Sequence, residues 1–103
     1  MRVANASERF AELIELDQVM LALAHPVRRF LLELIIIDGA YAGNLAASAA
    51  TKFGISTQRG SQHLKVLENA GIVEVTVDGT WRHYRLEPGS TESVSRWISS
   101  LWI

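Results

Sequence analysis

Four polar side chains in the segment 55–71 lie at a spacing that places them on one face of an α-helix. They recur at i, i+3, i+4 and i+7: Gln58, Ser61, Gln62 and Lys65. Gly60, Leu64 and Leu67 fall on the opposite face. The polar set combines amides, a hydroxyl and a cation, which are groups that hydrogen-bond to base edges and phosphates. The segment therefore predicts a helix that is apolar on its back and suited to DNA recognition on its front.

The side chains of this helix suit different parts of a DNA duplex. The amide of Gln62 can pair with adenine through two hydrogen bonds, so Gln62 is the candidate for base readout. Lys65 is assigned to a phosphate, and Arg59, at the edge of the face, suits either role. The alternative for all of these residues is an ordinary solvated face. One of Ser56 and Thr57 is expected only to cap the helix. The DNA-binding candidates on the helix are Ser56, Thr57, Gln58, Arg59, Ser61, Gln62 and Lys65.

The segment before this helix predicts its helical partner. A small-residue helix from about residue 44 to residue 53 is closed by Gly54, after a short loop at 40–43. Only Gly54 and Ile55 separate it from the recognition helix, predicted at 56–70. Two helices joined by so short a glycine-containing turn are typical of a helix-turn-helix.

The segment after the recognition helix predicts a β-hairpin, or wing, at 72–86. Two alternating runs, 72–77 and 80–86, are joined by Asp78-Gly79, a strong two-residue turn signal. Tyr84 is expected to anchor the sheet, and Trp81 either packs under the wing or lies exposed beside a groove. The wing's candidates for contact with the DNA backbone are Arg82 and Arg85.

Three further helices are predicted around this centre. Asn5 and Glu8 resemble a capping box for a first helix at 5–24. Pro26 begins a second helix, which ends at about residue 38 and is expected to be buried on most sides. The last helix, 91–103, carries two tryptophans on an apolar face, and a symmetric second copy is the simplest partner for it. The candidate dimer-interface residues of the first and last helices are Phe10, Leu13, Leu16, Val94, Trp97, Ile98, Leu101 and Trp102.

These elements define the predicted fold. Residues 1–103 form one domain that is mainly α with a β-hairpin (α+β), a winged helix-turn-helix of order α-α-α-α-β-β-α, with 5–24 and 91–103 as dimerisation helices. The chain has no cysteine, which excludes disulfides and thiolate metal sites. No apolar run reaches the roughly 18 residues of a membrane span, and the first residues lack a signal-peptide core. A cytoplasmic protein without a membrane partner is expected.

The distribution of charge is more informative than its sum. A net charge of −1 argues by itself against a nucleic-acid-binding protein. Residues 1–38 carry four basic and six acidic side chains, whereas residues 39–67 carry Lys52, Arg59 and Lys65 and no acid. An acid-free segment around the recognition helix is what binding to DNA requires.

Several segments together resemble the ArsR/SmtB-type repressors over roughly residues 20–87. They are His25 to Leu32, Ser61 to Leu67, Asn69 to Val73, and Gly79 with Tyr84 to Leu86. The resemblance implies a homodimer that represses transcription at an imperfect inverted-repeat operator. It also implies that the first and last helices form the dimer interface, that the recognition helix enters the major groove and that the wing lies near the minor groove.

The metal sites of that family do not carry over to this sequence. Tyr41 and Gly43 occupy the places of a Cys-x-Cys pair, and the last helix offers only Glu92 as a ligand. His25, His63 and His83 lie in different elements, and His63 is expected to pack or hydrogen-bond within the protein. No metal or cofactor is therefore predicted.

The sequence leaves some alternatives open. Arg28 and Arg29 either contact phosphates or pair with an acid such as Glu33. A winged helix can also act as a protein–protein interaction module without sequence-specific DNA binding. An enzyme is disfavoured, because no catalytic motif is present. A small-molecule or protein effector remains undefined, as do the operator sequence and the direction of regulation.

Overall fold

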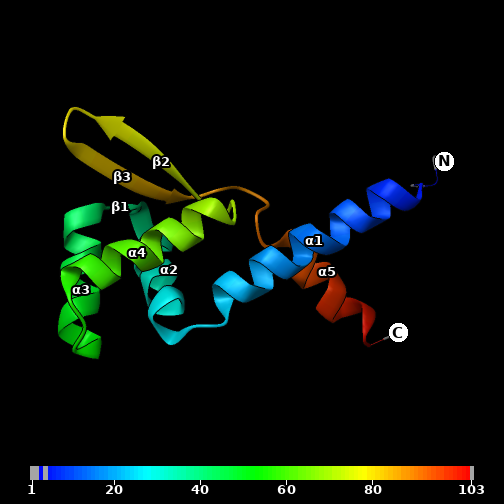
Figure 1. Cartoon of the computed structure of the whole chain (residues 1–103), viewed down its shortest axis with the longest axis horizontal. Helices are drawn as coiled ribbons and strands as arrows, with labels where there is room; N and C mark the ends of the chain where they lie inside the picture. Colours follow the sequence, from blue (N-terminus) through cyan, green and yellow to red (C-terminus); the bar gives the residue numbers. More distant parts are fainter. Residues whose placement is uncertain (1–2, 4, 103) are drawn as a thin grey trace.

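The computed structural model describes Val3 and residues 5–102 and confirms the predicted winged helix-turn-helix. Its elements are α1 (Ala6–Leu23), α2 (Pro26–Asp38), β1 (Ala40–Tyr41), α3 (Ala42–Phe53), α4 (Thr57–Asn69), β2 (Val73–Asp78), β3 (Trp81–Leu86) and α5 (Glu92–Ser100) (Figure 1). Within this part of the chain, no helix is long and apolar enough to span a lipid bilayer.

Local signals in the sequence set the ends of the helices. The Asn5 side chain accepts a hydrogen bond from the Glu8 N–H, as the capping pattern predicted. Pro26 lies in the first turn of α2, where its missing N–H costs no helical hydrogen bond. Gly54 ends α3 in the left-handed conformation. The recognition helix α4 therefore starts directly after α3, within one residue of its predicted bounds.

The sheet contains one strand that the sequence pattern missed. The predicted loop at 40–43 instead forms β1 and the first turn of α3, and β1 pairs antiparallel with β3, giving the order β1-β3-β2. A two-residue strand is too short to show the alternation by which strands are recognised. Its existence depends on the backbone groups of β3, which lies more than forty positions later in the chain.

The turn of the hairpin is displaced by one residue from its predicted position. Asp78 pairs with Trp81, so the two loop residues are Gly79 and Thr80, and not Asp78 and Gly79. Gly79 has φ of 61°, whereas Asp78 and Thr80 keep negative φ. A positive φ at the first loop position alone is the type II′ arrangement, which favours glycine there. The glycine signal was therefore correct, but its position within the turn was not.

One hydrophobic core joins α1, α2, α3, α4 and the sheet. Its buried residues are Val19, Ala22, Val27, Leu31, Ile35, Leu45, Ala49, Leu64, Leu67, Ile72, Val73 and Tyr84. Tyr84 anchors the sheet as predicted. The prediction that α2 is buried on most sides is wrong at its end, because Ile36 and Ile37 are exposed. Ile35 in the same turn is buried, so only one side of the end of α2 faces the core.

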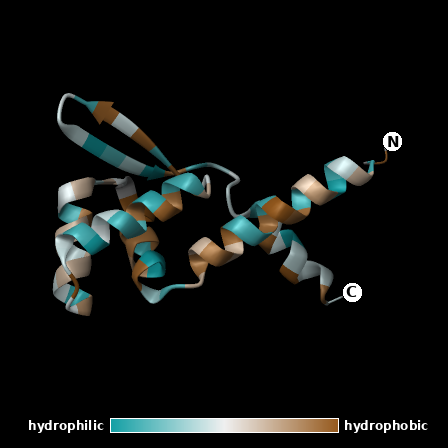
Figure 2. Cartoon of the chain, in the orientation of Figure 1, coloured by the Kyte–Doolittle hydropathy of each residue, from teal (hydrophilic) through white to brown (hydrophobic). Residues whose placement is uncertain are grey.

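The molecule is elongated, with extents of 47 × 30 × 22 Å. Figure 1 shows α2, α3, α4 and the sheet grouped at one end, whereas most of α1 extends away from them and packs against α5. Figure 2 shows hydrophilic and hydrophobic residues interleaved along α4, and a more hydrophilic β3 beside β2. The winged helix-turn-helix and the α1–α5 pair are therefore distinct parts of one chain.

Candidate nucleic-acid interface

The recognition helix α4 presents the predicted polar face to solvent. Gly60, Leu64 and Leu67 are buried against the core, and the four side chains of the opposite face are exposed: Gln58, Ser61, Gln62 and Lys65. Ser56 is the residue that caps the helix, because its hydroxyl accepts a hydrogen bond from the Arg59 N–H at 3.0 Å. Thr57 is the first helical residue and is exposed.

A close crossing of α3 and α4 fixes the angle at which this face is presented. A Cβ added to Gly60 would lie 3.1 Å from both the Cα and the carbonyl oxygen of Ala46. Backbone at this distance cannot be moved aside as the end of a flexible side chain can. Glycine at position 60, where a bulky apolar residue would fit the helical pattern, is therefore explained by the approach of α3.

Glu68 links the recognition helix to the wing. Its carboxylate lies 2.8 Å from the Lys65 Nζ and 3.5 Å from an Arg82 guanidinium nitrogen. Lys65 and Arg82 were assigned to DNA from the sequence, whereas Glu68 was not considered, because it lies one residue beyond the acid-free segment. The structure thus brings two candidate phosphate contacts together around one half-buried acid.

The two wing arginines lie on opposite faces of the hairpin. Residues alternate along β3, so that Arg82 shares the face of the buried Tyr84, towards α4. Arg85 shares the other face with His83 and lines a shallow hollow with Gly39 at the end of α2. Arg82 is therefore adjacent to the recognition helix, and Arg85 is not.

Trp81 lies at the tip of the wing with its side chain largely exposed. Its ring makes an edge-on contact with Tyr41 at a centroid distance of 5.6 Å, and Tyr41 also packs edge-on against His83 at 4.9 Å. These three rings occupy the face of the sheet formed by β1 and β3. Trp81 is therefore exposed and not packed under the wing, and its position beside a groove of DNA stays a prediction.

Arg28 connects three helices through hydrogen bonds. Its guanidinium group donates to the carbonyl oxygens of Leu21 and Ala22 at the end of α1 and lies 3.1 Å from Nδ1 of His63 on α4. Arg29 donates to the Leu23 carbonyl. Both arginines therefore hold the end of α1 to α2 through backbone carbonyl groups. The sequence predicted phosphates or Glu33 as their partners and not these carbonyl groups.

His63 is half-buried beside three basic groups. Burial lowers the pKa of His63, and the neighbouring charges of His25, Arg28 and Arg59 lower it further. Burial also lowers the pKa of Arg28. The predicted hydrogen bond of His63 within the protein is confirmed, and its partner is Arg28. The neutral form of His63 is thus favoured in the free protein.

Comparisons with known proteins place this arrangement in a family. No protein-family model and no curated sequence matches the chain. An ArsR-like transcriptional regulator from Rhodococcus sp. RHA1 is similar in structure, with a TM-score of 0.69, 25% identity and coverage of 88% of this chain and 82% of that one. A homodimeric winged helix-turn-helix DNA-binding domain from Mycobacterium bovis shares the fold, with a TM-score of 0.68, 24% identity and coverage of 98% and 87%.

A third solved structure decides the family. A possible transcriptional regulator for arsenical resistance is 38% identical to this chain, with a TM-score of 0.69 and coverage of 84% of this chain and 85% of that one. The chain belongs to the ArsR family of transcriptional regulators. Its resemblance to that family, inferred from the segments around His25, Ser61 and Tyr84, is thereby confirmed.

The aromatic cluster of this ArsR-family chain lies where the resemblance places a cysteine pair. Tyr41 packs against Trp81 and His83, and Gly43 lies beside it in the first turn of α3. Within the described residues, no group of three His, Asp or Glu side chains is arranged to hold a metal ion. Tyr41 therefore contributes aromatic packing at this place, and Gly43 has no side chain with which to bind a metal.

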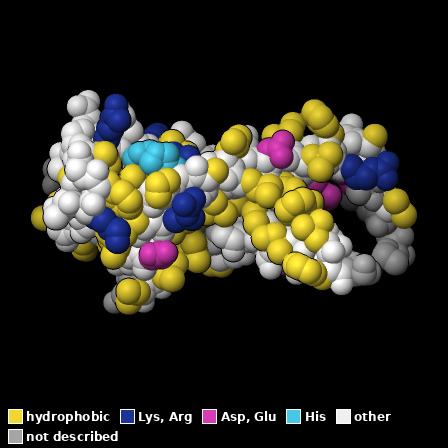
Figure 3. Space-filling model, turned by 90° about the horizontal axis from the view of Figure 1, so that it is seen from below, with side chains coloured by type: hydrophobic (Ala, Val, Ile, Leu, Met, Phe, Trp, Pro, Cys, Tyr) yellow, Lys and Arg dark blue, Asp and Glu magenta, His cyan; other side chains and the backbone are white. Residues whose placement is uncertain are grey.

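The α1–α5 pair presents a large exposed apolar face. Figure 3 shows hydrophobic side chains gathered over this half of the molecule. Six of the candidate interface residues are exposed: Phe10, Leu13, Trp97, Ile98, Leu101 and Trp102. Leu16 and Val94 are half-buried within the protomer, and Val94 packs against the core. Trp102 follows the end of α5, which the structure places at Ser100.

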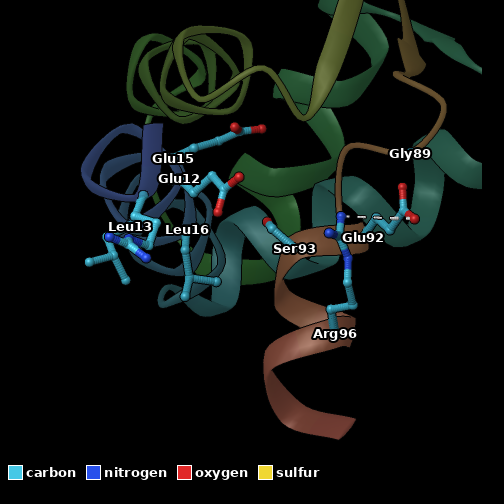
Figure 4. A pocket seen from close by; sticks show the side chains of 9 residues that line it. Glu12, Leu13, Glu15, Leu16, Gly89, Glu92, Ser93 and Arg96 are labelled. Carbon is cyan, nitrogen blue, oxygen red and sulfur yellow. Dashed lines mark ion pairs between the residues drawn. The ribbon is translucent and has the colours of Figure 1, made fainter. Parts of the chain in front are cut away.

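A cavity of about 590 Å³ lies between α1 and α5 at the edge of this face. Figure 4 shows Glu12, Leu13 and Leu16 of α1 opposite Ser93 and Arg96 of α5, with an ion pair between Arg96 and Glu92. The Ser93 hydroxyl is buried here and has no hydrogen-bond partner among the described residues. Removing this hydroxyl from water without a partner is unfavourable, which is consistent with a face that is incomplete in one protomer.

Proposed function

We propose that this ArsR-family protein is a homodimeric regulator, acting as a repressor, that binds an inverted-repeat operator through α4 and the wing. The observation that carries the proposal is the exposed polar face of α4, whose cation Lys65 shares the carboxylate of Glu68 with Arg82 of the wing. Regulators of the same fold in other organisms include a homodimeric DNA-binding domain.

Each candidate residue has a role in this proposal that follows from its position. Gln62 reads a base edge, with Gln58 and Ser61 beside it, and Lys65 holds a phosphate. Arg59, at the edge of the face, suits either role. Ser56 and Thr57 lie at the start of α4, where free N–H groups favour a phosphate. Arg82, on the wing, contacts the DNA backbone. Arg85 contacts DNA only where the duplex reaches the base of the wing.

The α1–α5 face is the proposed dimer interface, and dimerisation adds a second α4 to the DNA-binding site. A symmetric copy packed on Trp97, Leu101 and their neighbours covers the exposed apolar surface. Two α4 helices related by that symmetry would enter successive major grooves, about 34 Å apart, which explains the expected inverted repeat.

The test is selection of DNA from a random-sequence pool by the purified protein, followed by affinity measurements at several salt concentrations. Enrichment of one inverted repeat, with affinity that falls steeply as salt rises, is expected. Recovery of no enriched sequence, with no binding to any duplex at low salt, would refute the proposal. That result would favour the protein–protein interaction module, which uses the same surfaces without DNA.

A further inference from the structure

A hollow lined by basic and hydrogen-bonding groups lies between the start of α2 and the middle of α4. Its volume is about 340 Å³, and its lining residues are His25, Arg28, Arg59, Gln62, His63 and Val66. We refer to it as the His–Arg hollow. It contains no carboxylate among its lining residues, and it adjoins the exposed face of α4 through Gln62. The proposed function uses Gln62 and Arg59 but gives His25, Arg28 and His63 no role in binding.

The hydrogen bonds of the two histidines determine which ring nitrogen carries the proton. The His25 Nδ1 accepts from the Val27 N–H at 3.1 Å. The His63 Nδ1 lies 3.1 Å from Arg28 Nη1, and arginine can only donate, so this Nδ1 is also an acceptor. In its neutral form, each ring therefore carries its proton on Nε2. The two ring centroids are 4.3 Å apart, so that two N–H donors belong to one small site.

The lining of the hollow is consequently dominated by donors. Its lining residues His25, His63, Arg59 and Gln62 carry N–H donors, and Arg28 adds a positive charge and the N–H groups that its bonds to Leu21, Ala22 and His63 leave over. A metal cation is disfavoured, because both Nδ1 lone pairs are already used and two arginines lie beside the rings. An anion with several acceptor oxygens matches the set, and guanidinium groups pair with phosphate through two parallel hydrogen bonds.

We propose that the His–Arg hollow binds a phosphate group, and that in the DNA complex this group is a backbone phosphate next to the bases that α4 contacts. The identification of the bound group as a DNA phosphate rests on the proposed function. The binding of a phosphate group by the hollow does not. Arg28 then acts twice, because the guanidinium group that anchors the end of α1 also lines the phosphate site.

The charges around His63 give the proposal a measurable signature. His25 and Arg28 of α2 and Arg59 and Gln62 of α4 line the hollow with His63, and the three basic residues and burial keep its pKa low. A bound phosphate places negative charge among these groups and opposes them. The pKa of His63 is therefore expected to rise on binding, which means that protons are taken up and that binding tightens as pH falls.

The first experiment uses inorganic phosphate and NMR signals of the histidine rings. Phosphate is expected to move the signals of His25 and His63 in a saturable manner, whereas chloride at the same ionic strength is not. Arg59→Gln removes a charge from an exposed side chain of the hollow and should weaken phosphate binding about tenfold. Lys52→Gln, on α3 and outside the hollow, removes an equal charge and should leave phosphate binding unchanged.

The second experiment measures the pKa of His63 in the complex with a mixed-sequence duplex at low salt. A raised pKa of His63 in the parent complex supports the assignment to DNA, if the Arg59→Gln protein also fails to protect one backbone phosphate that the parent protects from chemical modification. Saturable binding of inorganic phosphate with an unchanged pKa in the DNA complex overturns that assignment and leaves a site for a free anion. Ring signals that respond neither to phosphate nor to DNA overturn the proposal. If the parent protein binds no DNA but its rings respond to phosphate, the proposed function fails and the hollow stands.

Discussion

At the scale of single residues, the proposed function assigns base readout and phosphate binding to different side chains on the face of α4. Lys65→Ala is expected to weaken binding to every DNA and to lower the slope of log affinity against log salt by about one unit. Gln62→Ala should leave that slope unchanged and reduce discrimination at one base pair by about 1–3 kcal/mol. Titrations of operator and non-operator duplexes at several salt concentrations test both. Parent-like behaviour of the two variants would show that another surface contacts DNA.

Glu68 predicts an effect of opposite sign. Its carboxylate lies between Lys65 and Arg82 and competes with phosphate for both cations. Glu68→Gln should therefore tighten binding to non-operator DNA and steepen its salt dependence, by up to about two units. The ion pairs are partly exposed, so the change in stability should stay within about 1 kcal/mol. Asp17→Asn, which removes an equal charge from the exposed surface of α1 and leaves the wing unchanged, is the matched control. Weaker binding of Glu68→Gln to all DNA would instead assign Glu68 a role in holding Lys65 and Arg82 in place.

The lowered pKa of His63 predicts a dependence of stability on pH. The unfolded chain binds a proton at the ordinary histidine pKa, near 6.5, whereas the folded chain resists protonation until lower pH. The unfolded state therefore holds more protons in this window, and the free energy of unfolding should decrease as pH falls through it. His63→Gln should flatten this dependence. Urea denaturation from about pH 7 to pH 5, in buffers without phosphate, measures the difference, and equal slopes for parent and variant would contradict it.

At the scale of elements, the crossing of α3 and α4 determines how the polar face is presented. Gly60→Ala gains up to about 1 kcal/mol of helix propensity, but its Cβ would meet the Ala46 backbone at 3.1 Å. A net loss of about 1–3 kcal/mol in the free energy of unfolding is expected, as for overpacked cores. Gly43→Ala, in α3, has no atom within 4 Å of its added Cβ and should be neutral or stabilising. Denaturant unfolding compares them, and a stabilised Gly60→Ala variant would mean that the helices separate at little cost.

The elements also show why some features followed from sequence and others did not. The polar face of α4, the cap at Asn5 and the glycine of the wing depend on neighbours in the chain, so local patterns predicted them. The strand β1 exists because Ala40 and Tyr41 meet Tyr84 and His83. The hydrogen bonds of Arg28 to α1 and its contact with His63 likewise depend on how the helices pack. Such contacts between distant segments leave no periodic signal in the sequence.

At the scale of the whole molecule, the elongated shape separates two surfaces of different chemistry. The polar face of α4 and Arg82 lie at the winged end, and the apolar face lies over α1 and α5 (Figure 3). Acidic residues are concentrated on α1, at Glu8, Glu12, Glu15 and Asp17. They lie on the element that extends away from the wing, so their repulsion of DNA is weakened by distance and by salt. A net charge near zero is thus compatible with the proposed binding of DNA at the winged end.

The apolar face makes the last prediction, which concerns assembly. Leu101→Glu places a charge on a residue that is 60% exposed in the protomer and that the proposed dimer would bury. Burial of an unpaired charge is strongly unfavourable, so the variant should be a folded monomer by light scattering and circular dichroism. Its affinity for the inverted repeat should fall at least a hundredfold, because each half-site is then bound separately. Val77→Glu, at a similarly exposed position on the wing, should remain dimeric. A dimeric Leu101→Glu protein with parent-like affinity would place the contact between protomers on another surface. A monomeric parent protein would show that the α1–α5 face is not a dimer interface.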